Sequence, residues 1–371
     1  MEAIKEFINA VSRPQIMFPM ILAVFFFVFP PTDRMLVINK KLRLYKLWTK
    51  EGGIILFALL FLAFAFGLTD VNFAKIVTKP DNVPIVGLIF LIFFFVWFSM
   101  KQGWENDARI AAGQRPKEAE DSKEKILVWP DLVYIEFIAL ILCTVLLIVW
   151  SIVLNAPLEG PANPTVSPNP SKAPWYFLGL QEMLVYFDPW IAGVLFPTVI
   201  MIGMMAIPYL DTNKKGCGYY SFKDRKMAIS IFMFYWLVLW LFLITVGTFL
   251  RGPNWNFFGP FEAWDIHKLE VLTNINLSEL IYMVWLKQRL PENILLREMW
   301  GFAVVFIYFG AMPLVLAKTL FKKVYATLGP FRYAIFTILL LMSISLPIKM
   351  ILRWLFNIKY IIAIPEFFFN I

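Results

Sequence analysis

The residues best suited to chemistry lie in one segment between two apolar runs, residues 155–190. Pro174, Trp175, Tyr176 and Phe177 stand together, and Glu182 follows in an otherwise apolar stretch. Flat aromatic rings, a phenolic hydroxyl and a carboxylate could together hold a flat apolar molecule and exchange its protons. This segment is therefore the first candidate for a functional site.

The local sequence predicts how this segment is built. Its first half holds six prolines before Trp175, which excludes a helix there. Residues 175–187 contain no proline and no β-branched run, so we expect a short helix at the membrane surface. Irregular backbone at membrane depth persists only where protein or a cavity covers it, so a covered pocket is expected here.

Composition places the chain among polytopic membrane proteins. Of its 371 residues, 60% are apolar, and the mean hydropathy is strongly positive. The net charge of +8 could suggest nucleic acid, but basic loops on one side of a membrane explain it better. We therefore expect a lipid environment and no nucleic-acid partner.

The fold class expected is all-α, with about eight transmembrane helices. The first candidate span is short and contains Pro19. The spans are predicted at residues 15–31, 53–68, 84–100, 133–154, 190–210, 228–250, 299–317 and 333–350.

Basic residues alternate between the loops. Loops 32–52, 101–132, 211–227 and 318–332 hold most of the 34 Lys and Arg residues. The positive-inside rule then puts these four loops on the inner side and both termini, with the 155–189 loop, on the outer side.

Several chemistries are excluded by residue counts. The single histidine, His267, lies outside the predicted spans, so neither a hydrolytic triad nor a histidine-rich metal site is expected. The two cysteines, Cys143 and Cys217, form no metal or covalent-haem motif. No metal site is predicted.

The chain resembles the C-terminal half of cytochrome b, which in b6f-type complexes is the separate subunit IV. The similarity is carried by Trp129-Pro130-Asp131-Leu132, by the 157–164 run PLEGPANP and by Pro174-Trp175-Tyr176-Phe177, on either side of a span. It covers roughly residues 126–255. The family's signature is Pro-Glu-Trp-Tyr in the corresponding loop.

The resemblance implies a subunit of a quinol:cytochrome c oxidoreductase that does not ligate haem and is not active alone. Family members oxidise quinol on the outer side, and this respiratory electron transport is coupled to proton translocation. The resemblance therefore implies an energy-transducing membrane, such as a bacterial inner membrane. Haem b would be held by a four-histidine, b6-like cytochrome b chain. The other implied partners are a Rieske iron–sulfur protein and c-type cytochromes, in a dimeric hetero-oligomeric complex.

The motif departs from the family at its acid. Pro174 occupies the position of the family's glutamate, and Ala173 that of its proline. Variants without this acid resemble menaquinol-using relatives, so menaquinol is the expected quinol. Pro174, Trp175, Tyr176 and Phe177 are the expected quinol-binding residues, and Tyr176 and Glu182 the expected catalytic residues.

Glu182 could replace the missing acid. On a helix, seven residues would place it on the same face as Trp175, about 10 Å further along. An apolar setting would suit a carboxylate that accepts protons near neutral pH. The alternative is an interfacial acid that faces water or pairs with Lys172.

Three segments are expected. Residues 1–125 form an additional membrane module with an inner linker, residues 126–255 form the cytochrome b-like module, and residues 256–371 form an outer amphipathic segment with two further spans. The aromatic segment 251–267 is either an interfacial anchor or a lid or docking ledge at the 155–189 loop.

The alternative function is a membrane transporter or a purely structural membrane subunit.

Overall fold

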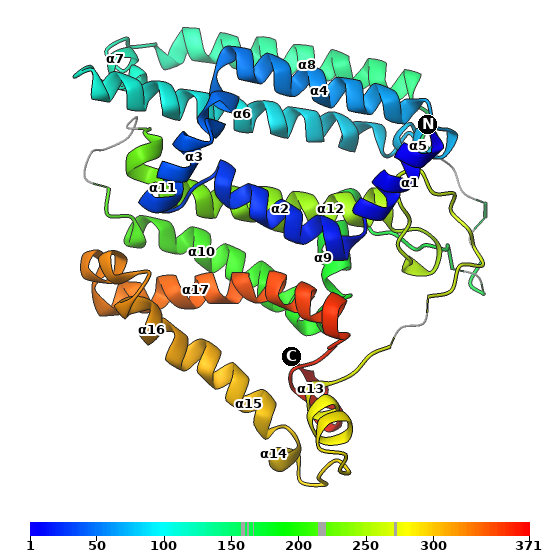
Figure 1. Ribbon diagram of the computed structural model, residues 1–371. Helices are drawn as coiled ribbons and strands as arrows, with labels where there is room; N and C mark the ends of the chain where they lie inside the picture. Colours follow the sequence, from blue (N-terminus) through cyan, green and yellow to red (C-terminus); the bar gives the residue numbers. More distant parts are fainter. Residues whose placement is uncertain (157–159, 162, 166, 214–219, 271–272) are drawn as a thin grey trace.

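The computed structural model describes residues 1–156, 160–161, 163–165, 167–213, 220–270 and 273–371 (Figure 1). The described part is predominantly helical, with only two short strands, which confirms the all-α class. The helices are α1 (Glu2–Val11), α2 (Pro14–Val28), α3 (Asp33–Lys41), α4 (Lys50–Leu68), α5 (Val71–Val77), α6 (Val83–Ala111), α7 (Lys117–Asp121), α8 (Val133–Val153), α9 (Leu178–Met183), α10 (Phe196–Leu210), α11 (Phe222–Met233), α12 (Phe242–Thr245), α13 (Leu277–Glu279), α14 (Ile294–Arg297), α15 (Met299–Phe306), α16 (Met312–Lys318) and α17 (Lys322–Phe356).

Turns of 3-10 or π helix extend or connect these helices. They are η1 (Leu44–Trp48), η2 (Val128–Leu132), η3 (Trp175–Phe177), η4 (Ile191–Leu195), η5 (Phe234–Leu241), η6 (Val246–Leu250), η7 (Pro253–Trp255), η8 (Leu280–Trp285), η9 (Ile307–Ala311) and η10 (Pro365–Phe367). The strands β1 (Ala363–Ile364) and β2 (Phe369–Asn370) pair antiparallel near the C-terminus.

Seven helical stretches of the described residues are long and apolar enough to cross a membrane. They are Lys50–Leu68, Val83–Ala111, Val128–Val153, Ile191–Leu210, Phe222–Leu250, Met299–Lys318 and Lys322–Phe356. The predicted first span corresponds to α2, whose 15 residues rise only about 22 Å, less than the roughly 30 Å hydrocarbon core. It counts as an eighth span only together with α1, to which it is bent by 75°.

The basic connections gather at one end of the bundle. Figure 1 places α3, α7, the start of α11 and the α16–α17 junction at the same end, and the described parts of the 155–189 and 251–276 segments at the other. This arrangement fits the predicted alternation of loops. Which end faces outward stays a prediction.

One hydrophobic core draws on all three expected segments. Phe18 and Met100 from the first, Val238 from the second and Leu346 from the third are at most 1% exposed and belong to the same cluster. The division at residues 125 and 255 stays a prediction, and its segments share a core.

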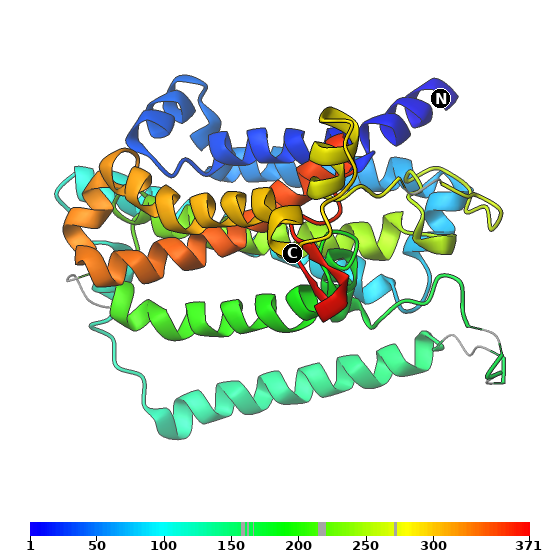
Figure 2. The same ribbon diagram turned by 90° about the horizontal axis from the view of Figure 1, so that it is seen from below.

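Helix α8 contrasts with this core because none of its residues is buried. Figure 2 shows it lying apart from the other helices, as a separate rod. Its residues are predominantly Leu, Ile and Val, a composition that suits contact with lipid or with another membrane protein. Cys143, which lies on α8, is exposed.

In the expected linker, α6 continues to Ala111, beyond the predicted span end at residue 100. Asn106, only 1% exposed, holds the linker in place. Its amide nitrogen donates to Tyr220 O at 2.8 Å and to Glu118 Oε2 at 2.6 Å, and its oxygen accepts from the Lys117 amide. These bonds tie the linker to the start of α11.

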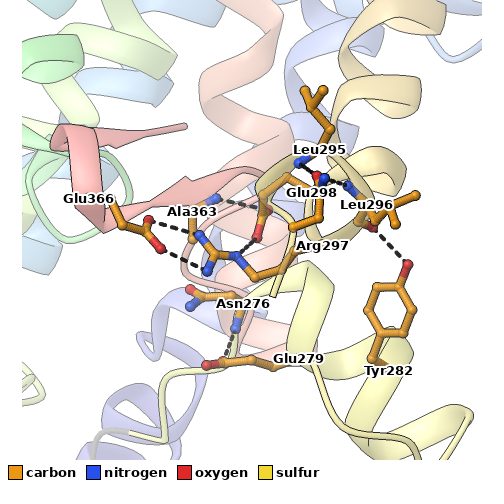
Figure 3. Close-up of polar contacts among 10 residues, drawn as sticks. Asn276, Glu279, Tyr282, Leu295, Leu296, Arg297, Glu298, Ala363 and Glu366 are labelled. Atoms are coloured by element: carbon orange, nitrogen blue, oxygen red, sulfur yellow. Dashed lines mark hydrogen bonds and ion pairs between the residues drawn. The ribbon is translucent and has the colours of Figure 1, made fainter. Parts of the chain in front are cut away.

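The C-terminal tail is fastened to the α14–α15 corner (Figure 3). Arg297 donates two hydrogen bonds to Glu366, at 2.9 and 2.8 Å. Glu298 is 1% exposed and accepts from the backbone amide of Ala363 at 3.0 Å. The expected amphipathic segment is broken into α13 with η8 and, further on, α14.

Candidate functional site

The short helix α9 lies directly on the span Phe222–Leu250. Glycine permits this approach: a Cβ added at Gly247 would lie 3.1 Å from Leu178 O, and one at Gly179 would lie 3.4 Å from Ile244. Leu178, Gly179, Glu182 and Met183 are the buried residues of α9. The short helix expected over residues 175–187 is present but shorter, since it consists of the η3 turn and α9 and ends at Met183. It turns Glu182 toward the bundle.

Glu182 is fully buried and accepts four hydrogen bonds. Arg251 donates from Nη2 to Oε1 at 2.7 Å and from Nε to Oε2 at 2.9 Å. The Tyr186 hydroxyl donates to Oε1 at 3.0 Å, and Trp255 Nε1 donates to Oε2 at 3.0 Å. A bidentate Arg–carboxylate pair with two further donors satisfies the whole carboxylate.

Burial and the Glu182 charge both shift the pKa values of the partners of Glu182, in opposite directions for Arg251 and in the same direction for Tyr186. Burial alone would lower the pKa of Arg251, but the Glu182 carboxylate outweighs it and raises that pKa. Burial, reinforced by the same carboxylate, raises the pKa of Tyr186. Arg251 therefore stays charged and Tyr186 stays a neutral donor, so both remain able to donate to the Glu182 side chain.

The three aromatic residues of the motif lie at the surface instead. Trp175, Tyr176 and Phe177 are 39%, 54% and 52% exposed. Trp175 and Tyr176 pack edge-on against each other and against Trp240, whose ring stacks on Trp236 with centroids 4.5 Å apart. Together these five residues form what we call the aromatic wall.

The structure separates Glu182 from the aromatic wall, contrary to the expectation that it shares a face with Trp175. Trp175–Phe177 is a 3-10 turn, which has 3.0 residues per turn, so a spacing of seven no longer returns to the same face. The alternative reading is also wrong, because Glu182 neither faces water nor pairs with Lys172. The sequence predicts a covered pocket here, but within this chain alone the aromatic residues form an exposed surface.

Pro174 begins the aromatic turn, and Gln181 fixes its position. The Gln181 side chain accepts from the Ala173 amide at 2.8 Å and donates to Ser171 O at 2.8 Å. The segment before Pro174 is thereby clamped to α9. No carboxylate stands at the position of the family's acid, since residue 174 is proline.

The segment 251–267 lies against the loop that leads into the wall. Asn254 and Asn169 exchange two hydrogen bonds, at 2.7 and 3.0 Å. Lys172 donates to Thr248 O at 2.8 Å and lies 4.8 Å from the centre of the Trp264 ring. Burial, the main cause, lowers the Lys172 pKa to about 8. These contacts fit the lid or ledge interpretation of the segment.

Sequence reasoning missed Arg251, Trp255, Tyr186 and Gln181. Arg251 offered a signal, because it is the cation at the end of the apolar run 228–250 and precedes Gly252-Pro253. Arg251 was expected only at the membrane interface, and nothing in the local sequence indicates its partner Glu182, which is 69 residues away.

The donor set does not fit a haem within this chain. Bis-histidine ligation needs two imidazoles per haem, whereas the chain has one, His267, which is exposed. Within the described ranges, no group of three or more His, Cys, Asp or Glu residues could hold a metal ion. Cys217 and residues 157–159 and 162 of the family-like run lie outside the described residues.

Comparison with known proteins identifies the segment that carries this site. Residues 161–261 match the family model described as cytochrome b (C-terminal)/b6/petD, a little over a quarter of the chain. No solved structure matches the chain. The match includes the aromatic turn, α9, Glu182 and Arg251, and it suggests a membrane subunit of the quinol:cytochrome oxidoreductase type. The resemblance to cytochrome b is thus confirmed: residues 161–261 of this membrane protein are similar to the C-terminal region of the cytochrome b family.

Proposed function

We propose that this chain is a subunit of a quinol:cytochrome c oxidoreductase and that residues 174–177 form one side of its outer quinol oxidation pocket. The observation that carries the proposal is the aromatic wall. Its residues Trp175, Tyr176 and Phe177 are about half exposed, it lies within the family-like segment, and its turn is held by the Gln181 clamp and by α9. A second chain would supply the facing side.

The residues of the wall suit a quinol ring. Trp175 and Phe177 offer flat apolar faces, and aromatic rings gain most from offset or edge-on packing. The Tyr176 hydroxyl can donate to or accept from a ring oxygen. Tyr176 is therefore the proposed catalytic contact, and Pro174, Trp175 and Phe177 are proposed binding residues.

Glu182 is proposed first as a positioning residue. Its carboxylate anchors α9 to Arg251 and Trp255, and so it fixes the turn that carries the wall. To accept a proton from quinol it would have to release one of its four donors. That catalytic role stays a prediction.

The charge-removing variant Glu182→Gln separates the two roles of Glu182. If Glu182 accepts the quinol proton, Glu182→Gln should slow quinol oxidation by the assembled complex by about ten-fold or more and shift its pH profile. An unchanged pH profile in assembled complex would leave Glu182 with the positioning role alone.

The proposed partners follow from the single histidine. A cytochrome b chain would hold haem b beside the wall, while a Rieske protein and c-type cytochromes would accept electrons, in a dimeric complex. Menaquinol is the proposed substrate, and its two protons would leave on the outer side. Helix α8, with no buried residue, supports the presence of a second membrane chain.

We also propose that both termini and the aromatic wall face outward. In a background with Cys143 and Cys217 replaced by Ser, an impermeant thiol reagent added to intact cells should label Asn163→Cys and not Lys117→Cys. The reverse labelling would overturn this topology.

Co-purification tests the function itself. A tagged chain isolated in complex from its native membrane should carry reducible haem b and reduce cytochrome c with quinol. The chain expressed alone should carry no haem b. A native complex without haem b would reject the proposal in favour of the transporter or purely structural alternative.

A further inference from the structure

An apolar groove lies between α4 and α6, in the N-terminal module outside the family-like segment. This open groove has a volume of about 660 Å³ and is lined on α4 by Gly53, Phe57 and Phe61 and on α6 by Gly87 and Trp97. This volume is within the roughly 300–1,000 Å³ typical of ligand pockets. Nothing in the proposed redox function uses this groove.

Glycine and aromatic residues shape the groove. A Cβ at Gly53 would lie 2.3 Å from the Trp97 ring, so glycine lets the indole lie against α4. Trp97 Nε1 donates to Leu47 O at 3.0 Å, which fixes the ring. At the other end, a Cβ at Gly87 would meet nothing within 4 Å. The groove therefore has a fixed wall at one end and free space at the other.

The length of the groove matches one leaflet of a bilayer. The eleven steps from Lys50 to Phe61 along α4 rise about 16 Å, and the ten steps between Trp97 and Gly87 along α6 rise about 15 Å. Half of the roughly 30 Å hydrocarbon core is about 15 Å. A groove of this length accommodates one acyl chain that enters from the Lys50 end.

Charge distinguishes the two ends of the groove. Among the described residues that line it, Lys50 alone is ionisable, and it is exposed at the first residue of α4. The loop before it carries further cations, including Arg43 and Lys46. Glu51 is exposed and does not line the groove. An ammonium at the mouth of an apolar groove complements an anionic headgroup with an acyl tail.

We propose that the α4–α6 groove binds one anionic phospholipid, with its headgroup phosphate at Lys50 and an acyl chain along Phe57 and Phe61 toward Gly87. The inference does not depend on the proposed redox function. A quinone would offer a similar tail but a neutral head, and Lys50 favours the anion.

Native mass spectrometry of the full chain in detergent, with phosphatidylglycerol or phosphatidylcholine of identical acyl chains, tests the site. Wild type should retain one phosphatidylglycerol in preference to phosphatidylcholine. Lys50→Gln should reduce this preference about five-fold, the scale of one lysine beside anionic lipid, and Lys50→Arg should keep it. These two variants isolate the headgroup contact.

A second pair of variants tests the tail contact. Gly87→Phe fills the open end of the groove and should abolish retention of the lipid. Gly193→Phe is the matched control, because Gly193 is also exposed, near the start of a span, with nothing within 4 Å of an added Cβ; it should retain the lipid. Equal retention of both lipids by wild type, or full retention by Gly87→Phe, would overturn the proposal. Menaquinone retained in place of phosphatidylglycerol, independently of Lys50, would also overturn it.

Discussion

Two helices of the cytochrome b-like segment expected at 126–255 differ in how far this chain buries their side chains. Helix α9 is six residues long, yet four of them are buried, and Glu182 has every hydrogen bond it can use. Helix α8 is 21 residues long and buries none. The first is completed by this chain, whereas the second requires lipid or a partner.

This difference separates what the chain does alone from what it does in an assembly. The buried ion pair fixes the turn that carries the aromatic wall, and it needs nothing from outside. The wall and α8 remain open, as surfaces that another chain would cover. Variants on the two sides of this division should therefore affect different properties.

The largest expected effect comes from breaking the buried ion pair. Arg251→Met leaves the Glu182 carboxylate buried without its counter-charge, which should lower the free energy of unfolding by about 3–5 kcal/mol. Thermal unfolding of the detergent-solubilised chain measures this loss. The double variant Glu182→Leu, Arg251→Met removes both charges and should recover most of it. A double variant as unstable as the single one would contradict the ion-pair account.

A matched pair of leucines tests the contrast between core and α8. Leu243 on α12 is 1% exposed, and Leu146 on α8 is 63% exposed. Leu243→Ala should cost about 2–5 kcal/mol through the cavity it leaves. Leu146→Ala should change the stability of the isolated chain by less than about 0.5 kcal/mol. Equal losses would show that α8 packs within the chain after all.

Lys172 gives a pH-dependent test of the loop that supports the wall. Its pKa is about 8 in the folded chain, below the ordinary 10.5, chiefly because it is buried. Between these two pH values the unfolded chain binds more protons, so the free energy of unfolding should rise with pH, by at most about 3 kcal/mol. Below pH 8 the cost of burying the charge is fully present.

Removing the Lys172 amine should remove this pH dependence. In Lys172→Met the rise between pH 8 and 10.5 should disappear, and unfolding at neutral pH should require more heat or denaturant than in wild type. Lys75→Met, on the exposed face of α5, is the control and should keep the rise. A rise that persists in Lys172→Met would place its origin elsewhere.

The sequence predicted what depends on local composition. Long apolar runs predicted the spans, and the lack of proline after Pro174 predicted the short helix that begins near Trp175. Charge alternation predicted which loops gather at one end. These features follow from hydropathy and backbone preference, which act within one segment.

Most of the misses depend on contacts between distant segments. The extension of α6 to Ala111 is stabilised by Asn106 against Tyr220, which no local pattern encodes. The direction of Glu182 depends on Arg251, 69 residues later, and on the 3-10 turn that changes the phase of α9. Hydropathy predicted α8 as a span but carried no information about its neighbours.

The rate of quinol oxidation by the assembled complex that carries Tyr176→Ala tests most directly whether the aromatic wall is the quinol site. The hydroxyl and ring of Tyr176 stand on the aromatic wall, 54% exposed and free to contact a substrate. Tyr209→Ala is the matched control, because Tyr209 is also exposed, at 75%, but ends α10 at the opposite end of the bundle. With equal assembly and haem content, Tyr176→Ala should slow quinol oxidation about ten-fold or more, on the scale of a lost catalytic contact, and Tyr209→Ala should not. Parental turnover by assembled Tyr176→Ala complex would contradict the assignment of the wall as the quinol site.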